Sequence, residues 1–184
     1  MRYTPAPLEG AFLIDLAPVS DERGFFARLF CAQEFSQNAL ENTFIQANNS
    51  LSIQKGTLRG LHYQLPPKAE TKLVRCLQGA LYDVILDLRK DSPTFGRSFG
   101  AILSAENRRM MYVPKGFAHG FLTLKEHSEI LYLVSQNYSK EHERGIRWDD
   151  PHFNIQWPDI PQVISERDQS HPDFDQSFHL EASV

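Results

Sequence analysis

The sequence has few cysteines, no excess of positive charge and no long hydrophobic run. Its two cysteines, Cys31 and Cys76, are too few for a disulfide framework. Both lie among apolar residues, as small buried side chains do, which fits a reducing, cytoplasmic setting. The formal net charge of −4 and the pI near 6.0 argue against nucleic acid or an anionic membrane as a partner. A local basic pocket stays compatible with this balance.

Signals for membrane insertion and export are also missing. No segment approaches the roughly 18 apolar residues of a spanning helix, and the N-terminus has no cationic stretch followed by an apolar run. The chain has no internal repeat and no low-complexity tract, and apolar residues are spread over residues 11–160. These absences predict one soluble, unexported domain over residues 1–184 with one active site.

Short apolar segments separated by turn residues make up most of the chain. They are rich in Phe, Tyr, Val and Ile and have the length of strands, as in TKLVRCLQG, ALYDVILDLR and EILYLVSQNY. Many short strands favour a sandwich or a barrel. Gln78-Gly79-Ala80 separates two of these segments, which predicts a β-hairpin with Gly79 at the positive φ of a tight turn.

Helical signals are weak. They are limited to residues 32–42 and to one turn over residues 104–109, where Ser104 is predicted to cap the turn that Glu106 opens. From about residue 161 the chain is polar and contains several prolines. We expect this segment to wrap the surface, to bring some residue near the site, and to end in a loose tail after about residue 170.

Two stretches carry the candidate chemistry. RGLHYQLPPKAETK (59–72) brings an arginine, a histidine and a lysine together, and VPKGFAHGFL (113–122) places His119 next to a sharp turn. Taken alone, the second stretch also fits a packed turn with a half-buried histidine. Together they loosely match the two motifs of the cupin jelly roll, with Glu70 and Gly79 in the first. We therefore predict an all-β cupin jelly roll, a double-stranded β-helix, with a few short helices.

A metal centre is one interpretation of these motifs. Metal-binding cupins present a His-x-His pair and a carboxylate in the first motif, because a divalent ion needs several converging N and O ligands. Here Gln64 replaces the second histidine, and the cations Arg59 and Lys72 oppose a divalent ion. We predict no metal, and a metal-dependent cupin remains the alternative from another class. A non-catalytic binding protein is a further alternative.

Without metal, a histidine, an arginine and a lysine suit the removal of a proton next to a carbonyl in a phosphorylated substrate. Imidazole accepts a proton near neutral pH, so His62 is the candidate base. Lys72 can stabilise an enolate oxygen, while Arg59 and Arg23 can bind phosphates. Each cation by itself also fits a solvated surface position. Their clustering favours a site.

Strand periodicity sets two conditions on this site. In a regular strand over residues 58–64, Arg59 and His62 point to opposite faces, so Gly60 must permit a bulge or the two residues serve different regions. Tyr132 shares its parity with Ile130 and is predicted to point inward. It is either a core aromatic or a second proton carrier on the face opposite His62.

Longer motifs cover most of residues 21–170: DERGFF (21–26), KGTLRGLHYQLPP (55–67), KLVRCLQG (72–79), DVILDLRKDSPTFG (83–96), VPKGFAHGFL and ERGIRWDDP (143–151). In these motifs the chain resembles the dTDP-4-dehydrorhamnose 3,5-epimerases, cupin-fold enzymes of deoxysugar biosynthesis. The resemblance implies an isomerase that inverts C3, C5 or both in a nucleotide-linked 4-keto-6-deoxyhexose, for O-antigen or other lipopolysaccharide sugars. The first expectation is conversion of dTDP-4-dehydro-6-deoxyglucose to dTDP-4-dehydrorhamnose. It implies no cofactor.

The resemblance also assigns roles to matching residues. His62 matches the base that removes the C3 and C5 protons, and Asp168 the carboxylate that orients it. Lys72 matches the residue beside the enolate oxygen, and Tyr132 the acid that reprotonates the opposite face. Contacts with the nucleotide-diphosphate sugar are implied for Arg23, Arg59, His119 and Glu143. Family members are generally homodimers that exchange N-terminal strands, so Arg23 is expected to complete the partner's site.

Departures from the family pattern concern the nucleotide. Arg28 stands where the family usually has a glutamate facing the base, Gln46-Ala47-Asn48 replaces Q-D-N, and Glu70-Thr71 replaces Gln-Gly. Cytosine presents an acceptor at N3 and suits arginine, whereas thymine suits a carboxylate. A CDP- or GDP-linked substrate is therefore the alternative to dTDP, unless Arg28 points to solvent or a phosphate. The further candidate substrate contacts are Arg28, Gln46 and Asn48.

Overall fold

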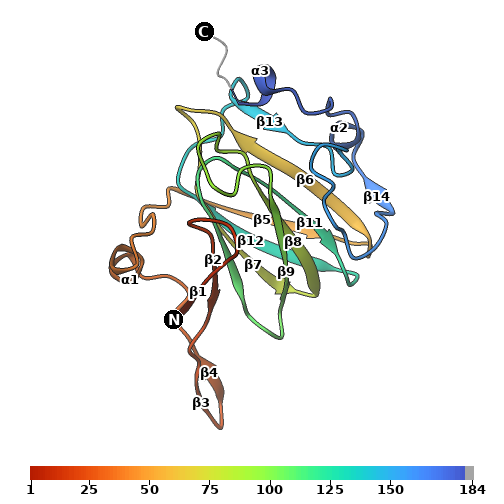
Figure 1. Ribbon diagram of the computed structural model, residues 1–184. Coiled ribbons are helices and arrows are strands. Elements are labelled where there is room, and N and C mark those ends of the chain that lie inside the picture. Colours follow the sequence, from red (N-terminus) through yellow and green to blue (C-terminus); the bar gives the residue numbers. More distant parts are fainter. Residues whose placement is uncertain (181–184) are drawn as a thin grey trace.

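Two six-stranded sheets, packed face to face, make up the body of this protein in the computed structural model, which describes residues 1–180 (Figure 1). The first sheet consists, in spatial order, of β1 (Arg2–Pro5), β2 (Phe12–Asp15), β10 (Met110–Val113), β7 (Lys72–Gln78), β12 (Ser128–Val134) and β5 (Gln46–Ser52). The second consists of β13 (Glu143–Gly145), β6 (Thr57–Gln64), β11 (Phe117–Thr123), β8 (Ala80–Asp87) and β9 (Ser98–Ser104), with β14 (Val163–Ile164) beside β6. All pairs except β14–β6 are antiparallel. This is the predicted all-β cupin jelly roll.

The main core lies between the sheets, and the period of two along each strand explains it. In β8, Leu81 and Ile85 point into this core, while Val84 and Leu86 point to the other face. That outer face is buried too, because residues 146–180 cover it. A strand buried on both faces reads as a nearly continuous apolar run, as β8 does.

The short helices lie at the periphery. They are α1 (Ala32–Gln37), α2 (Glu166–Gln169) and α3 (Gln176–His179). The helix predicted over residues 32–42 ends at Gln37, because the chain turns at Ala39 with a φ of 56°. Phe35 on α1 packs with Phe30 and Phe44 against the outer face of the first sheet. No helix in the described part of the chain is long and apolar enough to cross a membrane.

The hairpin predicted at Gly79 is wrong in its pairing, although the turn is correct. Gly79 has a φ of 72°, and a β-carbon there would lie 2.5 Å from Ser128 Oγ. However, β7 and β8 pair with different neighbours and belong to different sheets. Gly79 therefore forms a corner through which the chain passes from one sheet to the other. The Ser104 cap is present, since its Oγ accepts the Asn107 N–H at 3.0 Å.

The tail predicted to be loose after about residue 170 is packed as far as residue 180. His179 is fully buried, and its carbonyl accepts the Tyr63 hydroxyl at 2.9 Å. Phe174 packs on the outer face of the second sheet, which explains the ordering of this polar segment. Residues 181–184 lie outside the described residues. Neither cysteine forms a disulfide, and Cys76 is buried as predicted, whereas Cys31 is only partly buried.

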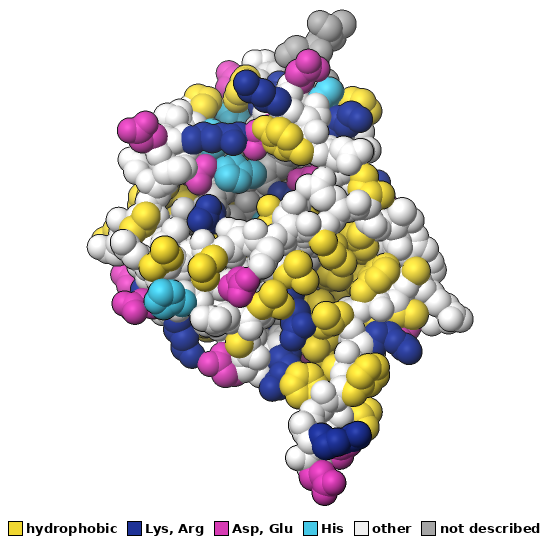
Figure 2. Space-filling model, turned by 180° about the vertical axis from the view of Figure 1, so that it is seen from behind, with side chains coloured by type: hydrophobic (Ala, Val, Ile, Leu, Met, Phe, Trp, Pro, Cys, Tyr) yellow, Lys and Arg dark blue, Asp and Glu magenta, His cyan; other side chains and the backbone are white. Residues whose placement is uncertain are grey.

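A two-stranded hairpin projects from the body, at the end away from the C-terminus (Figure 1). It consists of β3 (Val19–Asp21) and β4 (Gly24–Phe26). Val19 and Phe26 are 73% and 74% exposed. Figure 2 shows hydrophobic side chains on this hairpin and across the adjoining face of the body. Within residues 1–180, no segment covers that apolar surface.

Candidate active site

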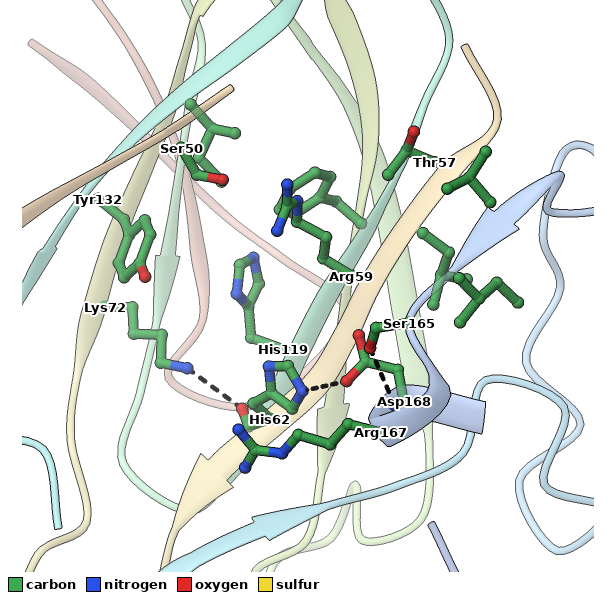
Figure 3. Close-up of a pocket in the computed structure, with 15 residues that line it drawn as sticks. Ser50, Thr57, Arg59, His62, Lys72, His119, Tyr132, Ser165, Arg167 and Asp168 are labelled. Carbon is green, nitrogen blue, oxygen red and sulfur yellow. Dashed lines mark hydrogen bonds and ion pairs between the residues drawn. The ribbon is translucent and has the colours of Figure 1, made fainter. Parts of the chain in front are cut away.

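A cavity of about 480 Å³ opens between the two sheets next to the C-terminal segment (Figure 3). Strands of both sheets and the start of α2 contribute to its wall. Its polar lining brings together side chains from across the chain: Ser50, Thr57, Arg59, His62, Lys72, His119, Tyr132, Ser165, Arg167 and Asp168. Six of the predicted catalytic and binding residues therefore line one cavity: Arg59, His62, Lys72, His119, Tyr132 and Asp168. Asp168 lies more than a hundred residues beyond His62 in sequence.

A bulge in β6 explains why Arg59 and His62 both line this cavity. His62 pairs with His119 on β11, but Arg59 pairs with Phe121, so three steps on β6 match two on β11. Of the two alternatives left open by the sequence, the bulge at Gly60 is the one present. Gly60 has a φ of 114°, and a β-carbon there would lie 2.6 Å from the Gly120 Cα. Only glycine fits this backbone and this spacing.

His62 forms a dyad with Asp168. Its Nε2 lies 2.7 Å from Asp168 Oδ1, and the Gly60 N–H donates to Oδ2 at 3.2 Å (Figure 3). Ser165 caps α2 by accepting the Asp168 N–H at 3.1 Å, which fixes the residue that carries the carboxylate. The carboxylate is buried, whereas the imidazole reaches the cavity.

Electrostatics set the proton position in this dyad. Burial by itself raises the pKa of Asp168, but the imidazoles of His171 and His62 together with the Gly60 N–H outweigh it, and the pKa lies well below its usual range. The carboxylate is therefore ionised at neutral pH and can only accept. His62 must donate from Nε2, which leaves the lone pair of a neutral ring on Nδ1.

Lys72 and Tyr132 lie on the opposite side of the cavity from Asp168 (Figure 3). The Lys72 Nζ donates to the His62 carbonyl at 3.2 Å and pairs with Glu70 Oε1 at 3.2 Å. Burial and the nearby Glu70 carboxylate raise the pKa of Tyr132, so its phenol keeps its proton at neutral pH. As predicted, Tyr132 points inward with Ile130.

A second imidazole–carboxylate pair lies deeper in the cavity. His119 Nε2 is 2.8 Å from Asp83 Oδ1, and Asp83 is fully buried with no hydrogen-bond partner for Oδ2 within residues 1–180. Sequence reasoning missed Asp83. The signal was available, because Asp83 lies within the apolar run ALYDVIL and shares the inward parity of Leu81 and Ile85.

Arg59 supplies positive charge farther along the cavity. Its Nε donates to Ser52 Oγ at 3.1 Å and its Nη2 to the Leu51 carbonyl at 3.3 Å. Both partners are neutral, so the guanidinium charge stays available to an anion.

Gln64, at the second histidine position of metal cupins, is buried, and its Nε2 donates to the Lys68 carbonyl at 2.9 Å.

Glu143 does not line the cavity but contacts a residue that does. It accepts the Tyr138 hydroxyl at 2.7 Å and pairs with Arg167, which lines the cavity. Sequence reasoning missed Arg167, although it directly precedes Asp168 in the SERDQ motif.

Gln46 and Asn48 lie on the edge strand β5, where the Gln46 Nε2 donates to Asn48 Oδ1 at 2.8 Å, and neither lines the cavity.

Arg23 and Arg28 also lie outside the cavity of this chain. Arg23 is at the tip of the β3–β4 hairpin and pairs with Asp21. Arg28 is 60% exposed, and its Nη1 pairs with Glu34 Oε1 at 3.0 Å. The pairing with a carboxylate agrees with the simpler interpretation of Arg28 as a surface residue rather than a reader of the base.

Comparison with known proteins decides the family. The sequence model of dTDP-4-dehydrorhamnose 3,5-epimerase matches residues 5–176. The chain belongs to the dTDP-4-dehydrorhamnose 3,5-epimerase family. A curated member from Sinorhizobium fredii is 50% identical over 153 residues, which cover 83% of this chain and 78% of the relative. The family resemblance and the isomerase class predicted from the motifs are confirmed.

Solved structures of dTDP-4-dehydrorhamnose 3,5-epimerase relatives share the fold. RmlC from Legionella pneumophila, in complex with dTDP-4-keto-L-rhamnose, has a TM-score of 0.90 and 37% identity, with 100% of this chain and 99% of that chain covered. ChmJ from Streptomyces bikiniensis, a 3'-monoepimerase in complex with dTDP, has a TM-score of 0.85 and 33% identity, with 92% and 85% covered. That ChmJ carries a histidine-to-asparagine and a tyrosine-to-phenylalanine substitution, as far apart in sequence as His62 and Tyr132.

Proposed function

We propose that this protein is a cofactor-independent epimerase that converts dTDP-4-dehydro-6-deoxyglucose to dTDP-4-dehydrorhamnose. The observation that carries the proposal is the His62–Asp168 dyad facing Tyr132 across one cavity. A base and an acid on opposite sides of a bound sugar can remove a proton from one face and return one to the other. The dTDP-linked ligands of relatives support this substrate class.

Proton removal is the task of His62. The 4-keto group acidifies the C3 and C5 protons, because the resulting carbanion is delocalised as an enolate. Nδ1 of His62 holds the lone pair that accepts such a proton, and Asp168 stabilises the imidazolium that forms. The short Nε2–Oδ1 contact also prevents the ring from rotating away.

Stabilisation of the enolate is the task of Lys72. Its ammonium group is buried against Glu70 and the His62 carbonyl, so it is held in place before substrate binds. A preorganised cation beside a developing oxyanion in a partly dry cavity needs little reorganisation. Tyr132 then donates a proton to the carbanion from the other side of the cavity. Its raised pKa keeps the phenol protonated up to this step.

The nucleotide diphosphate is assigned to the end of the cavity at Arg59. Its guanidinium charge faces neutral partners and can form paired hydrogen bonds with phosphate oxygens. His119, held by Asp83, lies between Arg59 and His62 in Figure 3 and is assigned to the sugar. We assign dTDP rather than CDP, because Arg28 is engaged with Glu34 and lies outside this cavity.

The assembly we propose is a homodimer in which the β3–β4 hairpin reaches the partner. Val19 and Phe26 need a cover that this chain does not supply, and Arg23 at the tip is too far along the hairpin to line its own cavity. In a two-fold dimer the same contact is made twice, so each Arg23 would complete the other chain's site. The two unpaired cysteines support a cytoplasmic location.

The proposal is tested by NMR in deuterated water with the 4-keto-6-deoxyglucose linked to dTDP or to CDP. We expect the sugar H3 and H5 signals to disappear with the dTDP substrate and to persist far longer with the CDP substrate. Loss of H3 alone would restrict the enzyme to one centre. Persistence of both signals with dTDP and with CDP would overturn the assignment and favour a non-catalytic binding protein.

A further inference from the structure

His171 lies next to the catalytic dyad and helps to lower the pKa of Asp168, but it takes no part in the proton transfers above. Its Nε2 is 3.8 Å from Asp168 Oδ1, too long for a hydrogen bond, and its ring centroid is 5.9 Å from that of His62. Within residues 1–180 this buried nitrogen has no hydrogen-bond partner. A buried, unpartnered imidazole nitrogen directed at a carboxylate needs an explanation, because such an atom is costly to desolvate.

The backbone makes room for this ring. Gly145 on β13 pairs with His62 on β6, and a β-carbon at Gly145 would lie 2.1 Å from His171 Nε2. Any side chain at residue 145 would therefore displace the imidazole from Asp168. The position of His171 depends on β13 and on the segment after α2, neither of which carries the dyad itself.

Three ligating atoms converge at this point. Nitrogen atoms of His62 and His171 and an oxygen of Asp168 all lie within 4.8 Å of one another. Ligands that share a zinc ion, each at about 2.0–2.2 Å from it, lie roughly 3–4 Å apart. The measured separations of 2.7 Å and 3.8 Å from the carboxylate to the two rings are close to that requirement.

Arg59 has only neutral partners and keeps its positive charge, but it lies beyond His119 as seen from His62 (Figure 3). Lys72 and Arg167 are each paired with a carboxylate. Asp168 adds an ionised carboxylate, and two imidazoles with one carboxylate form a ligand set suited to late first-row transition metals. We propose that His62, Asp168 and His171 form an inhibitory site for Zn²⁺ or a similar divalent transition ion.

Inhibition follows from the tautomers of imidazole and rests on the proposed epimerase function. A neutral ring has one proton, and the dyad keeps it on Nε2 so that Nδ1 can act as the base. When Nε2 of His62 binds the metal, that proton moves to Nδ1. The atom facing the substrate then cannot accept a proton, although the cavity itself stays open. The metal therefore inactivates the base by binding Nε2, the ring nitrogen that faces away from the substrate.

Binding is tested on the full chain without substrate, by calorimetry with Zn²⁺ and by the visible spectrum with Co²⁺. We expect one ion per chain and a Co²⁺ spectrum of low-coordinate N/O ligation. His171→Ala and the bulkier His171→Gln should each weaken binding on the order of tenfold or more. His127→Asn is the control, because His127 is an exposed histidine with a positive φ that asparagine tolerates.

Activity provides the second arm. Zn²⁺ should stop deuterium exchange by the wild-type protein, and chelator should restore it. In His171→Ala, the exchange rate should be the same with and without Zn²⁺, whatever its value without metal. Equal metal binding by the wild type and both His171 variants, or loss of binding in His127→Asn, would overturn the site. Metal binding that depends on His171 in a protein without exchange activity would instead uphold the site and reject the epimerase proposal.

Discussion

At the scale of single residues, the chemistry depends on which atom carries a proton. His62 and Tyr132 differ in this respect, although both face the same cavity. His62 can act as a base only because an ionised carboxylate holds the proton on its far nitrogen. Tyr132 can act as an acid only because burial keeps its phenol protonated. Substitutions at these residues should therefore have different signatures.

His62→Ala should abolish deuterium incorporation at both C3 and C5, because His62 is the assigned base and the second imidazole of the cavity, on His119, is assigned to the sugar. Tyr132→Phe should slow completed inversion while some exchange survives, because only the returning proton is affected. NMR of substrate in deuterated water separates the two outcomes. Wild-type exchange in the His62 variant would remove that residue as the base.

Asp168→Asn should lower the rate of exchange by about 10²- to 10⁴-fold. The amide removes the charge that stabilises the imidazolium and no longer enforces the Nε2–H tautomer. The measurement is the initial rate of exchange at C3, with circular dichroism to show that the variant is folded. A rate unchanged from wild type would refute the pairing.

Asp168 should also contribute to the pH dependence of stability. Its folded pKa lies below the unfolded value of about 3.9, so its contribution is fully present above that pH and is lost as the pH falls through about 4 toward the folded pKa. The free energy of unfolding measured with urea should therefore fall more steeply between about pH 5 and pH 3 for the wild type than for Asp168→Asn. Parallel slopes for the two proteins would count against a depressed pKa.

At the scale of elements, the bulge in β6 determines whether the site exists. Without the extra residue, Arg59 and His62 would face opposite sides of the sheet. Gly60→Ala should cost about 1–3 kcal/mol in the free energy of unfolding, because the new methyl group meets the Gly120 backbone at an unfavourable φ.

Gly24→Ala is the matched control for this substitution. Gly24 also has a positive φ, of 127°, but a β-carbon there meets nothing within 4 Å. The free energy of unfolding measured with urea should fall less for Gly24→Ala than for Gly60→Ala. Equal losses would mean that the backbone angle, and not the contact with β11, makes glycine necessary.

Elements also show where a local pattern stops being informative. The turn at Gly79 was readable from three residues, because a glycine between two apolar runs indicates a positive φ. The sheet to which each flanking strand belongs was not predictable. Because β7 and β8 have apolar residues on both faces, their patterns do not indicate which strands they pair with. The packing of the C-terminal segment is not predictable from sequence for a related reason. Its few aromatic side chains, such as Phe174, stabilise it only through contact with the second sheet.

At the scale of the whole molecule, the open question is which chain supplies Arg23. The β3–β4 hairpin carries it away from the cavity that His62 lines, and no other part of residues 1–180 covers the apolar face beside the hairpin. Both facts fit a two-fold dimer with shared sites. Single-chain variants cannot test this, whereas mixed dimers can.

Coexpressed Arg23→Ala and His62→Ala chains, each nearly inactive alone, should regain about a quarter of wild-type exchange activity, since half of random dimers are mixed and each holds one intact site. Asp168→Asn mixed with His62→Ala is the control, because both residues line the cavity of one chain and no mixed site is intact. Absence of recovery in the first mixture, with dimers confirmed by light scattering, would place Arg23 in its own chain's site or outside both.

The sequence by itself determined the strand content, the turn at Gly79 and the family, because each depends on residues close together in the chain. Tertiary structure alone decided the sheet that each strand joins, the packing of residues 171–180, and the distance from His62 to Asp168. It also placed Asp83 beneath His119 and His171 beside the dyad. Local propensity follows from neighbouring residues, whereas these contacts follow from how two sheets and a distant C-terminal segment share one buried volume.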